Sequence, residues 1–220
     1  MIPLYDTLHA RRFPLVNWLL IGLNALVFLY ELTLSPAGLD RLTRIWGLIP
    51  AELTAHPVEG WITIFTAMFL HGGWFHILSN MWVLFIFGDN VEDRMGGARY
   101  LIFYLLSGVA AALMEAFILP GSRVPMIGAS GAIAGVLGAY LILYPRARVA
   151  SLVPILFIFT IIEIPAVLFL LFWFVSQLFS GWLALGGAAG SGIAWWAHVG
   201  GFVFGMATVG LFAHRRTYYP

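Results

Sequence analysis

The chain has 220 residues, of which 61% are hydrophobic and only 10% are charged, and its formal net charge is +1. A soluble domain carries roughly 45–50% apolar and about 25% charged residues, so this composition predicts a membrane protein with lipid as its solvent. The near-neutral charge gives no basis for a nucleic-acid partner. The chain has no cysteine, which excludes disulfides, thiolate metal sites and a cysteine nucleophile.

Six apolar runs are typical of membrane helices, because a spanning helix needs about 20 mostly apolar residues. The first run follows Arg11 and Arg12, and a signal peptide also has basic residues before its apolar region. That region is usually ~7–15 residues long, and this run is longer, so we expect it to stay in the protein as the first helix. We therefore predict an all-α membrane protein, a six-transmembrane-helix bundle with a long first extracytoplasmic loop. In chain order the helices are expected at Val16–Leu34, Trp74–Val91, Tyr100–Leu119, Ser130–Tyr144, Pro165–Ser180 and Ala194–Ala213.

Three connections between these helices are unusual in length or composition. The first loop, Ser35–Gly73, is long, and the fifth, Gly181–Gly192, is so rich in Gly, Ala and Ser that it should be mobile. Val149–Ile164 is apolar, but Pro154 and Pro165 interrupt the apolar stretch here, and proline kinks or stops a helix. We expect this segment to dip into the membrane or to lie on it.

The arginines predict the orientation of the bundle. Cytoplasmic loops of membrane proteins carry an excess of basic residues, so the side with more arginine, which holds both termini, is expected to be cytoplasmic. Residues 1–14 are then a cytoplasmic N-terminal segment, 15–213 the six-helix membrane domain and 214–220 a short cytoplasmic tail. The terminal side holds Arg11, Arg12, Arg94, Arg99, Arg146, Arg148, Arg215 and Arg216, and the other side holds Arg41, Arg44 and Arg123.

Four polar residues fall at a similar depth in this topology. Polar and ionisable side chains are costly inside a membrane, so each is a functional candidate. The second, fourth and sixth helices run in the same direction, and each carries its candidates in its first one or two turns, just below the outer face. The four residues are His76, Asn80, Ser130 and His198.

Glycine spacing predicts which of these helices touch. Small residues four apart let two membrane helices approach closely, and if the two glycine faces meet, His198 is carried toward Ser130. The i,i+4 spacing of His76 and Asn80 places both on one face of the second helix. The glycine pairs are Gly131-x-x-x-Gly135 and Gly201-x-x-x-Gly205.

This set of residues is suited to acyl transfer. Serine becomes a nucleophile when a base takes its proton, and histidine is the usual base. The tetrahedral intermediate needs donors for its oxyanion, which the Asn80 amide, His76 and the Ser130 backbone N–H could supply. No cofactor and no metal are expected, and the chain has no His-Glu-x-x-His zinc motif.

Four motifs in this order resemble the rhomboid family of intramembrane serine proteases, in its bacterial-type six-helix form. The resemblance implies a dyad, with Ser130 as nucleophile and His198 as general base, and an oxyanion hole with His76 and Asn80. It also implies transmembrane-protein substrates and a bacterial inner-membrane location, with the site opening to the outer side; the oligomeric state is open. The motifs are His-Gly-Gly-Trp-Phe-His-Ile-Leu-Ser-Asn (71–80), Gly-Asp-Asn-Val-Glu-Asp-Arg-Met-Gly (88–96), Gly-Ala-Ser-Gly-Ala (128–132) and Ala-His-Val-Gly-Gly (197–201).

The chain departs from the family at two places. Many members have an aromatic residue four positions after the serine that stacks on the histidine, and here that residue is Ala134. Another group must then orient His198, with Trp195, Trp196 and Phe202 as candidates. A Trp-Arg pair common in the family's first loop is also missing. The fifth helix is expected to admit substrate along the side that carries Trp173, Phe174 and Gln177.

Other functions and roles stay open at this point. A catalytically inactive relative, a membrane chaperone or adaptor that binds transmembrane helices, would share much of the pattern, although inactive members lack the serine or the histidine. A transporter would predict charged residues through both leaflets. His76 and Asn80 could instead bind the backbone of the first loop. His71 could anchor that loop, and Glu115 could bridge two helices.

Overall fold

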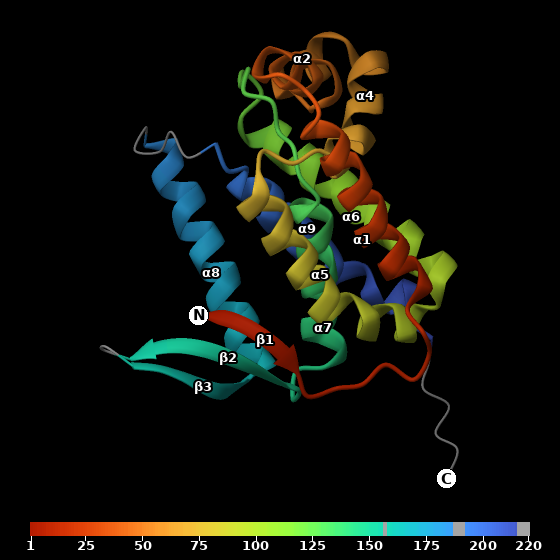
Figure 1. The fold of residues 1–220 in the computed structure, drawn as a ribbon, viewed down its shortest axis with the longest axis vertical. Helices are drawn as coiled ribbons and strands as arrows, with labels where there is room; N and C mark the ends of the chain where they lie inside the picture. Colours follow the sequence, from red (N-terminus) through yellow and green to blue (C-terminus); the bar gives the residue numbers. More distant parts are fainter. Residues whose placement is uncertain (156–157, 187–191, 215–220) are drawn as a thin grey trace.

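The computed structural model describes residues 1–155, 158–186 and 192–214, and most of them are helical (Figure 1). Helices occupy all six expected places, within a few residues of the expected bounds except that the fifth continues past Ser180. The Gly181–Gly192 loop is therefore shorter than expected, and 187–191 lie outside the described residues. The six helices are α1 (Leu15–Glu31), α5 (Trp74–Met95), α6 (Gly97–Ile118), α7 (Ser130–Leu143), α8 (Ala166–Leu185) and α9 (Trp195–Phe212).

The lengths and compositions of these helices identify an integral membrane protein. Within the described part of the chain, α6, α8 and α9 are each long and apolar enough to cross a bilayer, whereas α1 and α7 are shorter apolar helices. Figure 1 shows α8 at the edge of the bundle. Its outer side chains are large and apolar, as lipid contact requires, and include Phe172, Val175, Phe179 and Trp182.

The first connection is folded rather than an open loop. It contains α2 (Pro36–Trp46), α3 (Pro50–Ala55), α4 (Pro57–Thr66) and the 3-10 helix η1 (Ala67–Phe69). The three α-helices all begin with proline, whose missing N–H would have no partner in the first turn anyway. The chain then bends by 84° between the end of this segment and α5. This bend places 70–73 directly beside the start of α5.

The expectation of an all-α fold is wrong at one end of the bundle. The described parts of Val149–Ile164, which exclude 156–157, lie in two paired strands. The N-terminal residues add a third strand, in the antiparallel order β1-β2-β3 (Figure 1). The segment is rich in β-branched residues, which favour strands. Pro154 is tolerated because β1 pairs with β2 only as far as Leu152, so one edge of β2 has no ladder partner there among the described residues. The strands are β1 (Ile2–Asp6), β2 (Arg148–Ile155) and β3 (Ile158–Pro165).

Helix α7 lies at the centre of the core, and every residue from Gly131 to Leu141 is buried. Its contact with α9 depends on glycine. A Cβ at Gly201 would lie 2.1 Å from the Gly131 carbonyl oxygen, and a Cβ at Gly205 would lie 2.0 Å from that of Gly135. No side chain fits at such distances, so the two backbones touch directly. The predicted meeting of the two glycine faces is confirmed.

Candidate active site

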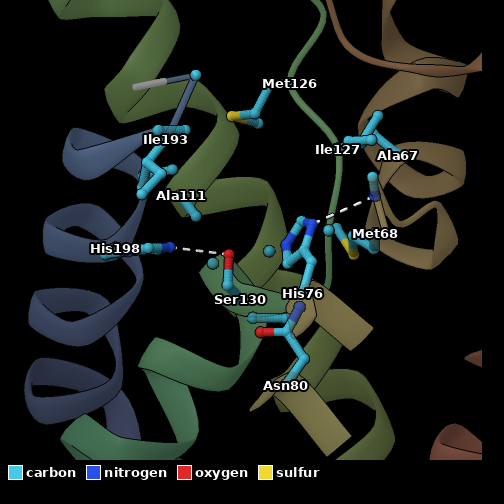
Figure 2. Close-up of a pocket in the computed structure, with 18 of the residues that line it drawn as sticks. Ala67, Met68, His76, Asn80, Ala111, Met126, Ile127, Ser130, Ile193 and His198 are labelled. Atoms are coloured by element: carbon cyan, nitrogen blue, oxygen red, sulfur yellow. Dashed lines mark hydrogen bonds between the residues drawn. The ribbon is translucent and has the colours of Figure 1, made fainter. Parts of the chain in front are cut away.

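Ser130 and His198 come together at the start of the two glycine-packed helices. Ser130 is the first residue of α7, and His198 lies in the first turn of α9. The His198 Nε2 atom is 2.8 Å from the Ser130 Oγ atom, as Figure 2 shows. The direct backbone contact between α7 and α9 holds the two side chains at hydrogen-bond distance, as the glycine spacing predicted.

The other side of the His198 ring is held by α8. The His198 Nδ1 atom is 2.8 Å from Gln177 Oε1. The Trp173 ring lies 5.9 Å from the imidazole, centre to centre, and the Trp195 ring 6.2 Å. Of the three candidates to orient His198, Trp195 therefore contacts its ring. Among the described residues, the hydrogen-bond acceptor for Nδ1 is Gln177 Oε1, a role that sequence reasoning missed.

The other two candidates pack elsewhere. Phe202 stacks on Phe174 at 4.6 Å between ring centres and also contacts Trp173. Trp196 lies against Gly181 of α8, where a Cβ would come within 3.1 Å of its ring.

The sequence did contain a signal for Gln177, because an amide within a long apolar helix needs a hydrogen-bond partner.

His76 lies across the site from His198 and presents its Nε2 atom toward the pocket (Figure 2). Its Nδ1 atom accepts a hydrogen bond from the Gly72 backbone N–H at 3.3 Å. A neutral imidazole carries one proton, so Nε2 carries it and is a donor. Gly128, with φ of +119°, passes so close that a Cβ there would lie 2.5 Å from His76 Nε2. Only glycine fits this position.

Asn80 completes this side of the site. Its side chain lies one helical turn below His76 on the same face of α5, as predicted (Figure 2). Asn80 is only 7% exposed, and its Nδ2 atom has no hydrogen-bond partner among the described residues. A buried donor without a partner costs roughly 1–3 kcal/mol. This amide is therefore available to an acceptor that enters the pocket.

A pocket of about 640 Å³ connects all four predicted residues. His198 lies on one side of Ser130, and His76 and Asn80 lie on the other (Figure 2). Such a space can hold a carbonyl group between a serine nucleophile and a set of donors. The pocket wall is otherwise largely apolar and includes Ile64, Met68, Phe75, Met126, Ile127 and Ile193.

Two carboxylates fix the surroundings of the pocket without lining it. The Glu115 carboxylate of α6 accepts from the Ala197 backbone N–H at 2.9 Å, which fastens the start of α9 beside His198. The Glu31 carboxylate of α1 accepts from the His71 backbone N–H at 3.1 and 3.2 Å. The helix-bridging role of Glu115 is confirmed. The loop is anchored at His71 through its backbone N–H; in the side chain, Nδ1 lies 3.3 Å from the Phe69 carbonyl oxygen, and Nε2 has no partner among the described residues. Sequence reasoning missed the partner of His71.

The described residues contain no group of three or more His, Asp or Glu side chains placed to hold a metal ion.

Several proteins of known family are similar to this chain. Rhomboid-like protein 11, chloroplastic, of Arabidopsis thaliana is 36% identical over 112 residues, which cover 51% of this chain and 39% of that protein. Rhomboid protein 1, mitochondrial, of Saccharomyces cerevisiae is 28% identical over 148 residues, 64% of this chain and 39% of its own. Rhomboid protease GluP of Bacillus subtilis is 33% identical over 129 residues, 58% of this chain and 24% of its own. The matches thus span about two fifths or less of these relatives.

The Rhomboid domain matches residues 58–215 of this chain. This range starts in α4, includes α5 to α9 and contains all four residues of the site. The match covers well over half of the 220 residues, and the chain therefore belongs to the Rhomboid family.

Proposed function

We propose that this chain is a serine endopeptidase that hydrolyses peptide bonds in or near the transmembrane segments of membrane-protein substrates. The observation that carries the proposal is the 2.8 Å hydrogen bond between Ser130 Oγ and His198 Nε2 at the base of the pocket. Membership of the Rhomboid family supports it, as does the likeness to a relative named as a rhomboid protease.

The reaction begins at the dyad. His198 Nε2 takes the Ser130 hydroxyl proton while Oγ attacks the scissile carbonyl carbon. The resulting oxyanion accepts hydrogen bonds from Asn80 Nδ2, His76 Nε2–H and the Ser130 backbone N–H, which is free because the first N–H groups of a helix have no intrahelical partner. The protonated His198 then gives its proton to the leaving amine, and the C–N bond breaks to leave an acyl-enzyme. Water, activated by His198, hydrolyses that ester and restores Ser130.

The proposal includes the placement of the chain in the membrane. Six helices would span it, with residues 1–14 and 214–220 cytoplasmic and the pocket near the outer face of a bacterial inner membrane. The 14 residues of α7 span only about 21 Å at 1.5 Å per residue, less than the ~30 Å of hydrocarbon. A short central helix leaves room above Ser130 for water, which the hydrolytic step requires.

A covalent probe tests the proposal directly. Purified full-length chain in detergent should react with a fluorophosphonate, and Ser130→Ala should abolish both this labelling and the cleavage of a single-span model substrate. His198→Ala should abolish cleavage, and unchanged thermal unfolding should show that both variants keep the fold. Substrate cleavage that persists in Ser130→Ala would disprove the mechanism. Substrate binding without cleavage or labelling by the wild type would favour an inactive adaptor instead.

A further inference from the structure

Gln177 is a buried amide in the middle of an apolar helix. Its neighbours on α8 include the exposed Phe172, Val175 and Phe179, whereas Gln177 is only 7% exposed. Burying an amide without hydrogen bonds costs about 1–3 kcal/mol by mutational measures. Gln177 therefore needs hydrogen-bond partners at this position, and one of them is His198.

The neighbours of Gln177 determine which way its amide points. Gln177 Nε2 donates to the Trp173 carbonyl oxygen at 3.3 Å and to Ser176 Oγ at 3.0 Å. The Ser176 hydroxyl proton is already used, because Oγ donates to the same Trp173 carbonyl at 2.6 Å. Both neighbours on this side are thus acceptors, and the amide NH₂ group must face them. The amide oxygen, Oε1, consequently faces His198.

An oxygen at this position specifies the tautomer of His198. An amide oxygen only accepts hydrogen bonds, so the His198 Nδ1 atom, 2.8 Å away, must carry the proton. The neutral ring then has its lone pair on Nε2, the atom that is 2.8 Å from Ser130 Oγ. In the opposite tautomer, Nε2 would present a proton to the serine and could not accept one. The tautomer that Gln177 selects is the one that a general base needs.

We infer that Gln177 is the positioning residue of the dyad, an inference that rests on the proposed function. It fixes both the tautomer and the ring orientation of His198. The tilted Trp173 ring, 5.9 Å away, limits rotation of the imidazole, where Ala134 offers no aromatic face. A neutral amide suits this depth, because a carboxylate in its place would carry the cost of a buried charge.

The first test compares two variants that each replace one buried or half-buried polar side chain with an apolar one. Gln177→Met keeps the volume of the side chain but removes the acceptor. Thr208→Val removes a hydroxyl that, among the described residues, donates within α9, to the Phe204 carbonyl oxygen. A positioned general base contributes roughly 10²–10⁴-fold to rate. Gln177→Met should therefore lower kcat and the rate of fluorophosphonate labelling about 10- to 100-fold with KM nearly unchanged. Thr208→Val should leave all three within about twofold.

The second test reads the tautomer without any activity. In full-length wild type labelled with ¹⁵N-histidine, the His198 signals, assigned by their loss in His198→Ala, should place the proton on Nδ1. In Gln177→Met the proton should move at least partly to Nε2, and Thr208→Val should match the wild type. The inference would be overturned if the His198 proton of the wild type lies on Nε2, or if Gln177→Met reacts with the fluorophosphonate as fast as the wild type. Absence of Ser130 labelling in the wild type would instead overturn the proposed function, and the tautomer measurement would still stand.

Discussion

The polar side chains at the two ends of α7 differ in whether their hydrogen bonds are satisfied within the protein. At the first end, Ser130 faces a pocket and the neighbouring Asn80 Nδ2 atom has no partner among the described residues. At the other end, the Tyr140 hydroxyl donates to the Asp6 carboxylate, to which the Asn90 amide also donates at 3.1 Å. The hydroxyl of Tyr144 donates to the Asn90 carbonyl oxygen at 3.0 Å. One end is open to a ligand, and the other is closed by internal bonds.

This difference separates a functional polar group from a structural one. At the closed end, the hydrogen bonds join β1 to α5 and α7, so they stabilise the fold. At the open end, a donor is left free. Several described side chains have buried polar atoms without a partner, but only Asn80 among them also lines the pocket. Substitutions in or beside α7 should therefore change catalysis at one end of the helix and stability at the other.

The largest expected effect is that of Asn80→Ala. In the proposed mechanism Asn80 is an oxyanion donor, and removing one such donor lowers kcat by roughly 10²–10³. The loss of a donor that had no partner should not destabilise the fold. Steady-state cleavage and thermal unfolding of the same preparation measure both quantities. A kcat within twofold of the wild type would place Asn80 among the structural residues.

A substitution at the contact between α9 and the middle of α7 should lower both stability and activity. Gly205→Ala would place a Cβ 2.0 Å from the Gly135 carbonyl oxygen, and overpacking of this kind costs typically about 1–3 kcal/mol. The free energy of unfolding and the labelling of Ser130 should both fall, because α9 moves away from α7. Gly210→Ala is the matched control on the same helix, since a Cβ there would meet no described atom within 4 Å outside its own stretch of helix. Equal stability of the two variants would contradict direct backbone contact.

Tyr140→Phe should affect stability alone. It removes the hydroxyl that donates to Asp6, and hydrogen bonds are worth about 0.5–1.5 kcal/mol, or more when one partner is charged. We expect a loss of about 1–2 kcal/mol in chemical unfolding with kcat within twofold of the wild type. A large fall in kcat with unchanged stability would reverse the assignment of the two ends.

The smallest expected effect is the pH dependence that Asp6 adds to stability. Burial raises the pKa of Asp6 above its ordinary value of 3.8, although the hydrogen bond from Tyr140 opposes this. The folded chain then holds this proton more tightly than the unfolded chain. The contribution is fully present below pH 3.8 and is lost as pH rises through the higher folded pKa. Asp6→Asn should flatten this part of the profile of melting temperature against pH, and an unchanged profile would contradict it.

The sequence by itself determined the six apolar helices and the composition of the site. Long apolar runs must form helices in lipid, because each unsatisfied backbone group there costs several kcal/mol, and this is a local property of the chain. The glycine pairs on α7 and α9 predicted that these two backbones meet and therefore that His198 lies close to Ser130. The motifs identified His76 and Asn80. These inferences rest on the spacing of residues within each helix.

Only the tertiary structure decided the sheet and the partners of individual side chains. The strand from Arg148 to Ile155 is as apolar as a membrane helix, and its pairing with β1 joins residues far apart, such as Asp6 and Val149. The hydrogen bond from His198 Nδ1 to Gln177 Oε1 depends on how far α8 is rotated about its axis and shifted along α9. Helical periodicity gives the angle between residues of one helix but not the rotation of one helix relative to another. That rotation is set by packing across the whole bundle.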